Sequence, residues 1–255
     1  MRANYHTHTS RCGHAEGADA EYAKAAYEKG FQVFGFSDHT PYWFDGSYYS
    51  TMRMPREDLW DYAESIRSLQ QEYAGKMEIL LGLEMEYYPK YFERTLSMAK
   101  QAGIRYLLLG QHWVGNEEGE PYSGHATEDE KHLDRYCGQV MDAMSSGLFT
   151  YLAHPDLLRF VGDDAIYEKY IRRLCRAARD YDMPLEINCV GIRLGRHYPN
   201  PKFWKLAGEE GCKVVLGGDY HDPADIGEKE TEEKALRLVE QFRLDLQETV
   251  PIRTI

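Results

Sequence analysis

The sequence predicts an α/β fold: a distorted, TIM-like barrel of seven strand–helix units in a single domain. Short apolar runs of strand length alternate along the chain with longer segments in which apolar residues recur every three or four positions. Parallel barrels are built from such alternating units. The length of 255 residues also suits one barrel, which commonly needs about 200 to 250 residues. We therefore expect one domain over residues 1–255.

Seven strands can be counted, one fewer than in a complete barrel, so we expect the barrel to be distorted or incomplete. The first strand lies at the start of the chain, directly before His6. The six others are short apolar runs rich in β-forming residues, and they cover residues 32–37, 78–84, 106–112, 149–154, 184–188 and 213–219.

Helical patterns fill the intervals between these strands. In the clearest one, Leu59, Ala63 and Ile66 belong to one apolar stripe, and Pro55 stands at a plausible first helical position. Several helices should end at a glycine that suits a C-terminal cap, namely Gly30, Gly103, Gly147 and Gly211. The other helical patterns lie near residues 22–26, 92–99, 133–144, 167–181, 203–207 and 235–242.

Two segments do not fit the alternation. Residues 40–54 are aromatic and contain glycine, residues 113–127 are polar and acidic, and both follow strand ends. Loops at this end of a parallel barrel usually shape the substrate pocket. Packing over the mouth of the barrel is an equally good explanation.

Composition limits the class of partner and the compartment. The formal net charge is −12, and the lysines and arginines are scattered, so we expect no nucleic-acid partner. The five cysteines are odd in number and lack a C-x-x-C pair, which favours reduced thiols. No apolar run approaches the roughly 18 residues of a membrane span, and the N-terminus leaves no room for a signal peptide. We therefore expect a cytoplasmic protein with no membrane partner.

Metal-binding residue types follow the predicted strands. Because the carboxyl ends of barrel strands share one face, we expect these side chains to form one site with the nitrogen and oxygen ligands that suit zinc, manganese or iron. The candidate ligands are His6, His8, His14, His39, Glu84, His112, His154, Asp219 and His221.

A single histidine at a strand end is better explained by an ordinary hydrogen bond than by a metal. His6 and His8 alone form only a weak signal, although residues two apart on a strand point to the same face. The whole set is different, because seven of the ten histidines stand at or just past strand ends. Independent packing requirements would not produce that distribution.

The candidate ligands belong to short motifs at the predicted strand ends. These motifs are His6-Thr7-His8-Thr9, Cys12-Gly13-His14, Ser37-Asp38-His39, Gly82-Leu83-Glu84-Met85-Glu86-Tyr87, Gly110-Gln111-His112, Ala153-His154-Pro155-Asp156, Glu186-Ile187-Asn188 and Gly218-Asp219-Tyr220-His221-Asp222. In these motifs the chain resembles the polymerase and histidinol phosphatase (PHP) family, in its histidinol-phosphatase branch. The resemblance spans essentially the whole sequence.

The resemblance implies a seven-unit barrel and a centre of three divalent metal ions. His6, His8, Glu84 and Asp219 would hold one ion, and Glu84 would bridge to a second ion held by His112 and His154. His14, His39 and His221 would hold the third. The implied reaction is hydrolysis of L-histidinol phosphate to L-histidinol and phosphate, a step of histidine biosynthesis.

The expected mechanism is attack by a hydroxide that two metal ions share, with Glu84 as the bridging catalytic carboxylate. Asp38 and Asp219 are both candidates for the proton donor. Arg159 and Arg193 follow strand ends and could bind phosphate, although each could equally form a surface ion pair. Candidate residues for the rest of the substrate are Trp43, Glu186 and Asn188.

Three other functions remain open at this stage. The chain could act on nucleotides or another small phosphomonoester with the same metals. It could hydrolyse an amide or a carboxylic ester. It could also be a metal-binding protein without catalytic activity, although such a protein would tolerate gaps in the ligand set, and no expected ligand is missing here.

Overall fold

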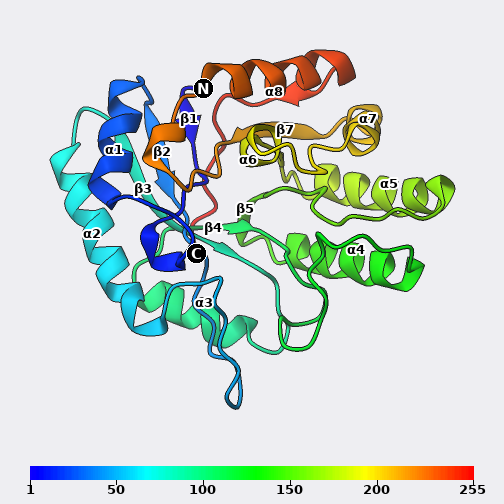
Figure 1. Ribbon diagram of the computed structural model, residues 1–255, viewed down its shortest axis with the longest axis horizontal. Helices are drawn as coiled ribbons and strands as arrows, with labels where there is room; N and C mark the ends of the chain where they lie inside the picture. The colour runs from blue at the N-terminus through cyan, green and yellow to red at the C-terminus, as the bar shows by residue number, and fades with distance from the viewer.

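The computed structural model describes residues 1–255 and contains one parallel sheet that curls around a common axis (Figure 1). All neighbouring strands are parallel, and their order in the sheet is their order in the chain. The strands are β1 (Ala3–Asn4), β2 (Val33–Phe36), β3 (Glu78–Met85), β4 (Tyr106–Leu109), β5 (Phe149–Leu152), β6 (Leu185–Asn188), β7 (Lys213–Gly217) and β8 (Asp245–Leu246).

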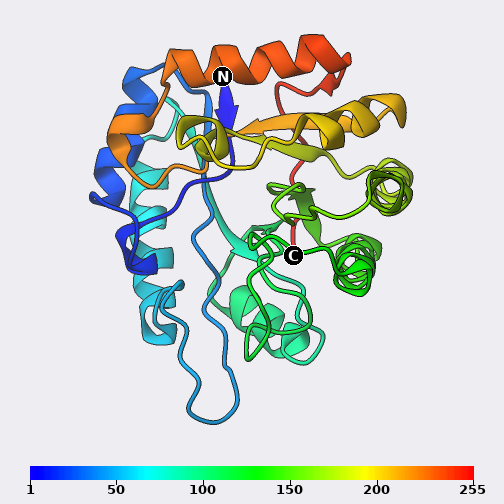
Figure 2. The same ribbon diagram turned by 45° about the vertical axis from the view of Figure 1, so that its right-hand side comes forward.

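The helices lie around the outside of this sheet (Figures 1 and 2). The α-helices are α1 (Asp19–Glu28), α2 (Leu59–Glu72), α3 (Phe92–Gln101), α4 (Glu130–Ser145), α5 (Asp164–Asp180), α6 (Cys189–Arg193), α7 (Pro201–Glu209) and α8 (Lys229–Phe242). Three short 3-10 turns are η1 (Ser10–Cys12), η2 (Arg56–Asp58) and η3 (Pro223–Asp225). None of the α-helices combines the length and apolar character that crossing a bilayer requires.

The predicted α/β barrel class is confirmed, but the count of seven units is not. The sheet has eight strands, because residues 245–246 form a short β8 beside β7 that the sequence pattern did not indicate. β8 does not pair with β1, so the barrel stays open, as the expectation of an incomplete barrel implies. Pro55 precedes η2, and α2 itself begins at Leu59.

Two apolar clusters lie on the two faces of the curled sheet. The larger cluster of 59 buried residues fills the layer between sheet and helices. The smaller cluster fills the inside of the barrel, where Tyr5, Tyr106 and Tyr151 pack with small aliphatic side chains. Val250, from the C-terminal segment, belongs to this inner cluster. The C-terminus accordingly lies at the middle of the molecule in both views (Figures 1 and 2).

The segment between β2 and α2 extends away from the body of the molecule in both views (Figures 1 and 2). It contains the aromatic residues 40–54, and Tyr48, Tyr49 and Met52 are exposed on it. Both this segment and the one between β4 and α4 follow the carboxyl ends of their strands. These ends surround the candidate site.

Candidate metal centre

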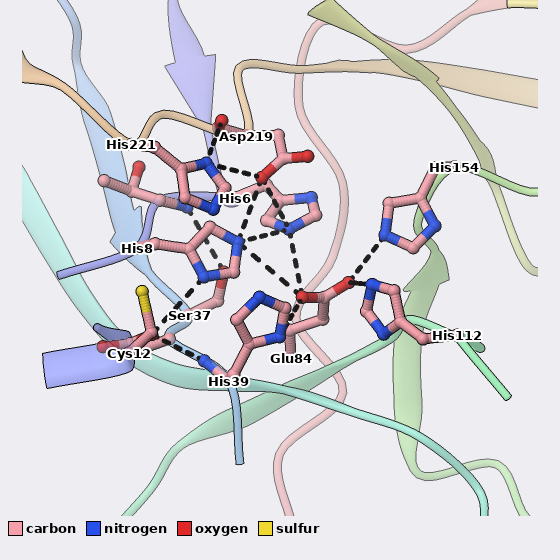
Figure 3. Close-up of polar contacts among 12 residues, drawn as sticks. His6, His8, Cys12, Ser37, His39, Glu84, His112, His154, Asp219 and His221 are labelled. Atoms are coloured by element: carbon pink, nitrogen blue, oxygen red, sulfur yellow. Dashed lines mark hydrogen bonds and ion pairs between the residues drawn. The ribbon is translucent and has the colours of Figure 1, made fainter. Parts of the chain in front are cut away.

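The side chains predicted to bind metals meet where the strands end (Figure 3). They come from the residues that follow β1, β2, β4, β5 and β7 and from the carboxyl end of β3. Most of them are buried, and all except His112 contribute ligand atoms to groups that lie within 4.8 Å of one another. The strands themselves stop two to four residues before most of these side chains, which therefore lie in the connections beyond the strands.

Glu84 stands at the centre and turns its two oxygens to different neighbours (Figure 3). Glu84 Oε1 lies 2.7 Å from His154 Nε2 and 3.6 Å from His112 Nε2. Glu84 Oε2 lies 3.0 Å from His39 Nδ1 and 3.6 Å from His6 Nε2. One carboxylate thus faces two sets of imidazoles, which is the arrangement that a bridging ligand requires.

A second carboxylate, Asp219, faces the histidines of the first motif. Asp219 Oδ1 lies 3.0 Å from His8 Nε2 and 3.5 Å from His6 Nε2. The Nε2 atoms of His6 and His8 are 3.1 Å apart. These three side chains form a compact nitrogen and oxygen group beside Glu84 Oε2.

The remaining imidazoles form a third group next to these two. The ligand atoms of His14, His39 and His221 lie within 4.8 Å of one another. The ring of His14 is 5.2 Å from that of His39 and 5.0 Å from that of His221, centre to centre. His14 is the most exposed member of the group.

The electrostatics of the cluster favour ionised acids and at least one neutral imidazole. Burial opposes the ionisation of Glu84, yet charge on His112 and other imidazoles holds the pKa of Glu84 well below its ordinary value. Burial likewise opposes ionisation of Asp219, and His6 lowers the pKa of Asp219 well below its ordinary value. Burial and a charged neighbouring imidazole lower the pKa of His221 to about 3. Carboxylates and neutral imidazoles are the states that coordinate metals.

Two observations indicate that these residues fit divalent cations. Neither Glu84 Oε2 nor Asp219 Oδ1 accepts a well-formed hydrogen bond, although both atoms are buried. Buried polar atoms are normally satisfied, so a positive partner would remove this deficit. The donor set mixes imidazole nitrogen and carboxylate oxygen, as zinc, manganese and iron sites do.

Buried carboxylates contact the far side of three of the imidazoles. Glu186 Oε1 lies 2.8 Å from His6 Nδ1, and Glu86 Oε1 lies 2.7 Å from His112 Nδ1. Asp38 Oδ1 lies 3.4 Å from His8 Nδ1. Such contacts orient an imidazole and keep its other nitrogen free for a cation.

The backbone makes room for this arrangement at two glycines. A Cβ on Gly110 would overlap the carboxylate of Glu84, and a Cβ on Gly217 would overlap that of Glu186. His154 and Asp219 have positive φ angles of 30° and 48°, which are uncommon for residues with side chains. Backbone strain of this kind often accompanies functional sites.

A cavity of about 440 Å³ lies above the cluster. Of the residues predicted to contact substrate, only Arg193 lines it, and its guanidinium pairs with Asp225 at 2.9 Å. Arg196, Tyr198 and Tyr122 also line the cavity. Tyr122 belongs to segment 113–127, for which shaping the pocket was one of the two explanations. Arg196 and Tyr198 lie in the connection between α6 and α7, where the strand pattern gives no signal for a site residue.

Four predicted residues lie elsewhere. Arg159 is exposed and does not line the cavity. Trp43 borders a separate surface hollow with Trp60 and Arg94. Glu186 and Asn188 are buried beneath the ligands, where they bond His6 and Asp219, respectively.

Asp38 also lies behind the ligands. It is fully buried, accepts a hydrogen bond from Thr9 Oγ1 and another from the backbone N–H of His39, and does not line the cavity. Asp219, in contrast, lines the cavity. Of the two carboxylates that were candidates for proton transfer, only Asp219 therefore faces the cavity.

The chain is similar in sequence to proteins named histidinol-phosphatases. The chain is 33% identical over 233 residues to a probable histidinol-phosphatase of Deinococcus radiodurans, covering 87% of each chain. It is 27% identical to a probable histidinol-phosphatase of Schizosaccharomyces pombe, covering 89% of this chain and 83% of the relative.

The fold is shared with a histidinol phosphate phosphatase of Lactococcus lactis, whose crystal structure is a complex with zinc, L-histidinol and phosphate. The TM-score is 0.74 at 19% identity, covering 98% of this chain and 96% of the other. The PHP domain model matches residues 4–189, a segment that includes seven of the nine candidate ligands. The chain therefore belongs to the PHP domain family.

Proposed function

We propose that this chain is a metal-dependent phosphomonoesterase that hydrolyses L-histidinol phosphate to L-histidinol and phosphate, with residues 1–255 as one catalytic unit. The observation that carries the proposal is the position of the imidazole and carboxylate cluster, which forms the floor of a cavity with arginines on its wall. The names of the relatives and the ligands in the Lactococcus structure support this choice of substrate.

The proposed metal centre holds three divalent ions, with zinc preferred over manganese and iron because the Lactococcus structure contains zinc. His6, His8, Asp219 and Glu84 would hold one ion, while His112, His154 and Glu84 would hold the second. His14, His39 and His221 would hold the third. Bound ions would supply an acidified water as nucleophile and positive charge for the phosphoryl oxygens.

The side chains of the cavity would orient the phosphate. Arg196 and Arg193 line the wall, and a guanidinium matches two phosphoryl oxygens at once. Arg193 also contacts Asp225, which limits its freedom, so we assign the larger share of binding to Arg196. Of the two candidates for proton transfer we choose Asp219, because Asp219 lines the cavity and Asp38 does not.

The other end of the substrate carries an ammonium group and an imidazole. Glu16 and Asp222 line the same cavity, and their carboxylates would attract that positive charge. This part of the proposal replaces Trp43, which borders a different hollow.

The test is a phosphate-release assay on protein loaded with zinc, manganese or iron. The proposal expects release from L-histidinol phosphate at a kcat/KM at least about 10²-fold higher than from nucleoside monophosphates and simple alkyl phosphates, since a site that hydrogen-bonds its substrate discriminates strongly. A higher kcat/KM for a nucleotide would show that the substrate is a nucleotide, while the proposed class of metal-dependent phosphomonoesterase would stand. Absence of release from every phosphate would overturn the proposal and favour a metal-binding protein without catalytic activity.

A further inference from the structure

A buried ionic cluster lies beside the metal centre and outside the cavity. It consists of Arg53, Glu86 and Glu117, whose exposed fractions are 4%, 0% and 3%. Arg53 donates to both oxygens of Glu86, from Nη1 at 2.8 Å and from Nη2 at 2.6 Å. It also donates to Glu117 Oε2 from Nε at 2.8 Å and from Nη2 at 2.6 Å.

Aromatic rings enclose this guanidinium. Its central carbon lies 5.0 Å from the ring centre of Tyr42, 5.9 Å from that of Tyr88 and 5.8 Å from that of Trp113. Two carboxylates facing one guanidinium leave an excess negative charge in a dry environment. Such an excess is costly unless a further positive or hydrogen-bonding group adjoins it.

The adjoining group is His112. Glu86 Oε1, the oxygen that accepts from Arg53 Nη2, also lies 2.7 Å from His112 Nδ1. The other ring nitrogen, Nε2, lies 3.6 Å from Glu84 Oε1. A carboxylate at Nδ1 holds the imidazole proton there, so Nε2 presents its lone pair toward Glu84.

The cluster also connects segments that are distant in sequence. Arg53 lies in the segment between β2 and α2, Glu86 follows β3, and Glu117 lies in the segment between β4 and α4. Met52, the neighbour of Arg53, lines the cavity. One side chain therefore links both long segments at the mouth of the barrel to a proposed metal ligand.

We propose that Arg53 is a positioning residue of the metal centre. By holding Glu86 against His112 Nδ1, it fixes the tautomer and the ring orientation of His112, and so strengthens binding of the cation at His112, His154 and Glu84. This inference rests on the proposed function only for the existence of that cation.

The test uses the variant Arg53→Lys, which keeps the charge but cannot form the two-pronged contact with Glu86. Zinc affinity of the metal-free full-length protein is measured by calorimetry against a competing chelator. We expect one zinc ion to bind about 10- to 100-fold more weakly, the range found for groups that support a metal ligand, and the others to bind as in the wild type. The control is Arg56→Lys, since Arg56 lies over the ring of Trp43 and makes no contact with Glu86.

A second readout does not depend on metal. Long-range nitrogen–proton NMR of the metal-free protein reports which ring nitrogen of His112 carries the proton. The inference expects Nδ1 in the wild type and a mixture of tautomers in Arg53→Lys. A proton on Nε2 in the wild type, or unchanged zinc binding together with an unchanged tautomer in Arg53→Lys, would overturn it.

Two further variants cover the case in which Arg53→Lys does not fold, which circular dichroism would detect. Glu86→Gln should weaken the same zinc ion, whereas Glu117→Gln keeps the Arg53–Glu86 contact and should weaken it less. Equal effects of the two variants would contradict the inference. Zinc binding by a wild type that releases no phosphate would overturn the proposed function and leave this inference standing.

Discussion

At the residue scale, the site depends on where single carboxylate oxygens point. Glu84 Oε1 faces His112 and His154, while Glu84 Oε2 faces His6 and His39. No other carboxylate of the cluster faces imidazoles on both sides. Loss of this one charge therefore affects both sets of imidazoles at once.

Glu84→Gln should consequently reduce phosphate release from L-histidinol phosphate by on the order of 10²- to 10³-fold or more, the range for removing one group that stabilises charge at an active site. Metal content, measured by plasma mass spectrometry, should fall in the same variant because a neutral amide is a poor ligand. The control is Glu57→Gln, an exposed residue of η2. Full activity and metal content in Glu84→Gln would contradict the assignment.

Gly110 makes a second prediction at this scale. A methyl group there would overlap the carboxylate of Glu84, so Gly110→Ala should displace Glu84 and lower metal content and activity together. The matched control is Gly138→Ala, where α4 leaves open space around the new Cβ. That control should leave activity unchanged and stabilise the helix by roughly 0.5–1 kcal/mol. If both variants retain metal equally, Gly110 is not needed to make room for Glu84.

At the element scale, strands β2 to β7 could be predicted because each lies in a short apolar run between helical patterns. The predicted 78–84 and 213–219 correspond to β3 and β7, which end at Met85 and Gly217. Ligand residue types stand at the ends of these runs, so the residues of the metal cluster could be predicted from the sequence. The pattern could not predict which other side chains reach the cavity.

Two residues illustrate why. Arg196 lies beyond α6 in a connection without periodicity, so its place on the cavity wall follows only from tertiary packing. Glu186 follows the same strand-end rule as the ligands, but its carboxylate turns beneath them to contact His6. A strand-end rule predicts proximity to the site and not the direction in which a side chain points.

The start of α5 gives a prediction about element stability. Asp163 caps this helix by accepting from the backbone N–H groups of Ala165 and Ile166 at 2.8 Å and 3.1 Å. Asp163→Ala should lower the free energy of unfolding by about 1 kcal/mol, the usual value of such a cap, with kcat unchanged. Asp163→Asn serves as the control because asparagine caps equally well. Urea denaturation measures both, and equal losses in both variants would show that the cap contributes nothing.

At the scale of the whole molecule, the C-terminal segment covers the inner core of the open barrel. Arg253 N donates to Thr150 Oγ1, Ile255 N donates to Arg105 O, and Thr254 bridges Tyr106. These partners lie at the starts of β4 and β5, the end of the barrel opposite the cluster. Because β8 does not pair with β1, the open barrel relies on this segment to cover its inner core.

Val250 tests this role of the segment. Its side chain is 6% exposed and packs into the inner cluster with Tyr5 and Tyr151, while its backbone N–H donates to Tyr5 Oη at 3.2 Å. Val250→Ala removes two buried methyl groups, so the free energy of unfolding should fall by roughly 1.5 kcal/mol. Metal content and kcat should not change at a temperature where both proteins are folded, because the ligands lie at the other end of the strands.

The control for Val250→Ala is Glu248→Ala, whose exposed side chain makes only a long ion pair of 3.8 Å with Arg2. Its effect on unfolding should stay within about 0.5 kcal/mol, as for other surface substitutions. Urea denaturation followed by circular dichroism compares the two variants. A loss of metal in Val250→Ala without a loss of stability would contradict this account, since it would couple the C-terminal segment directly to the metal centre rather than to the inner core.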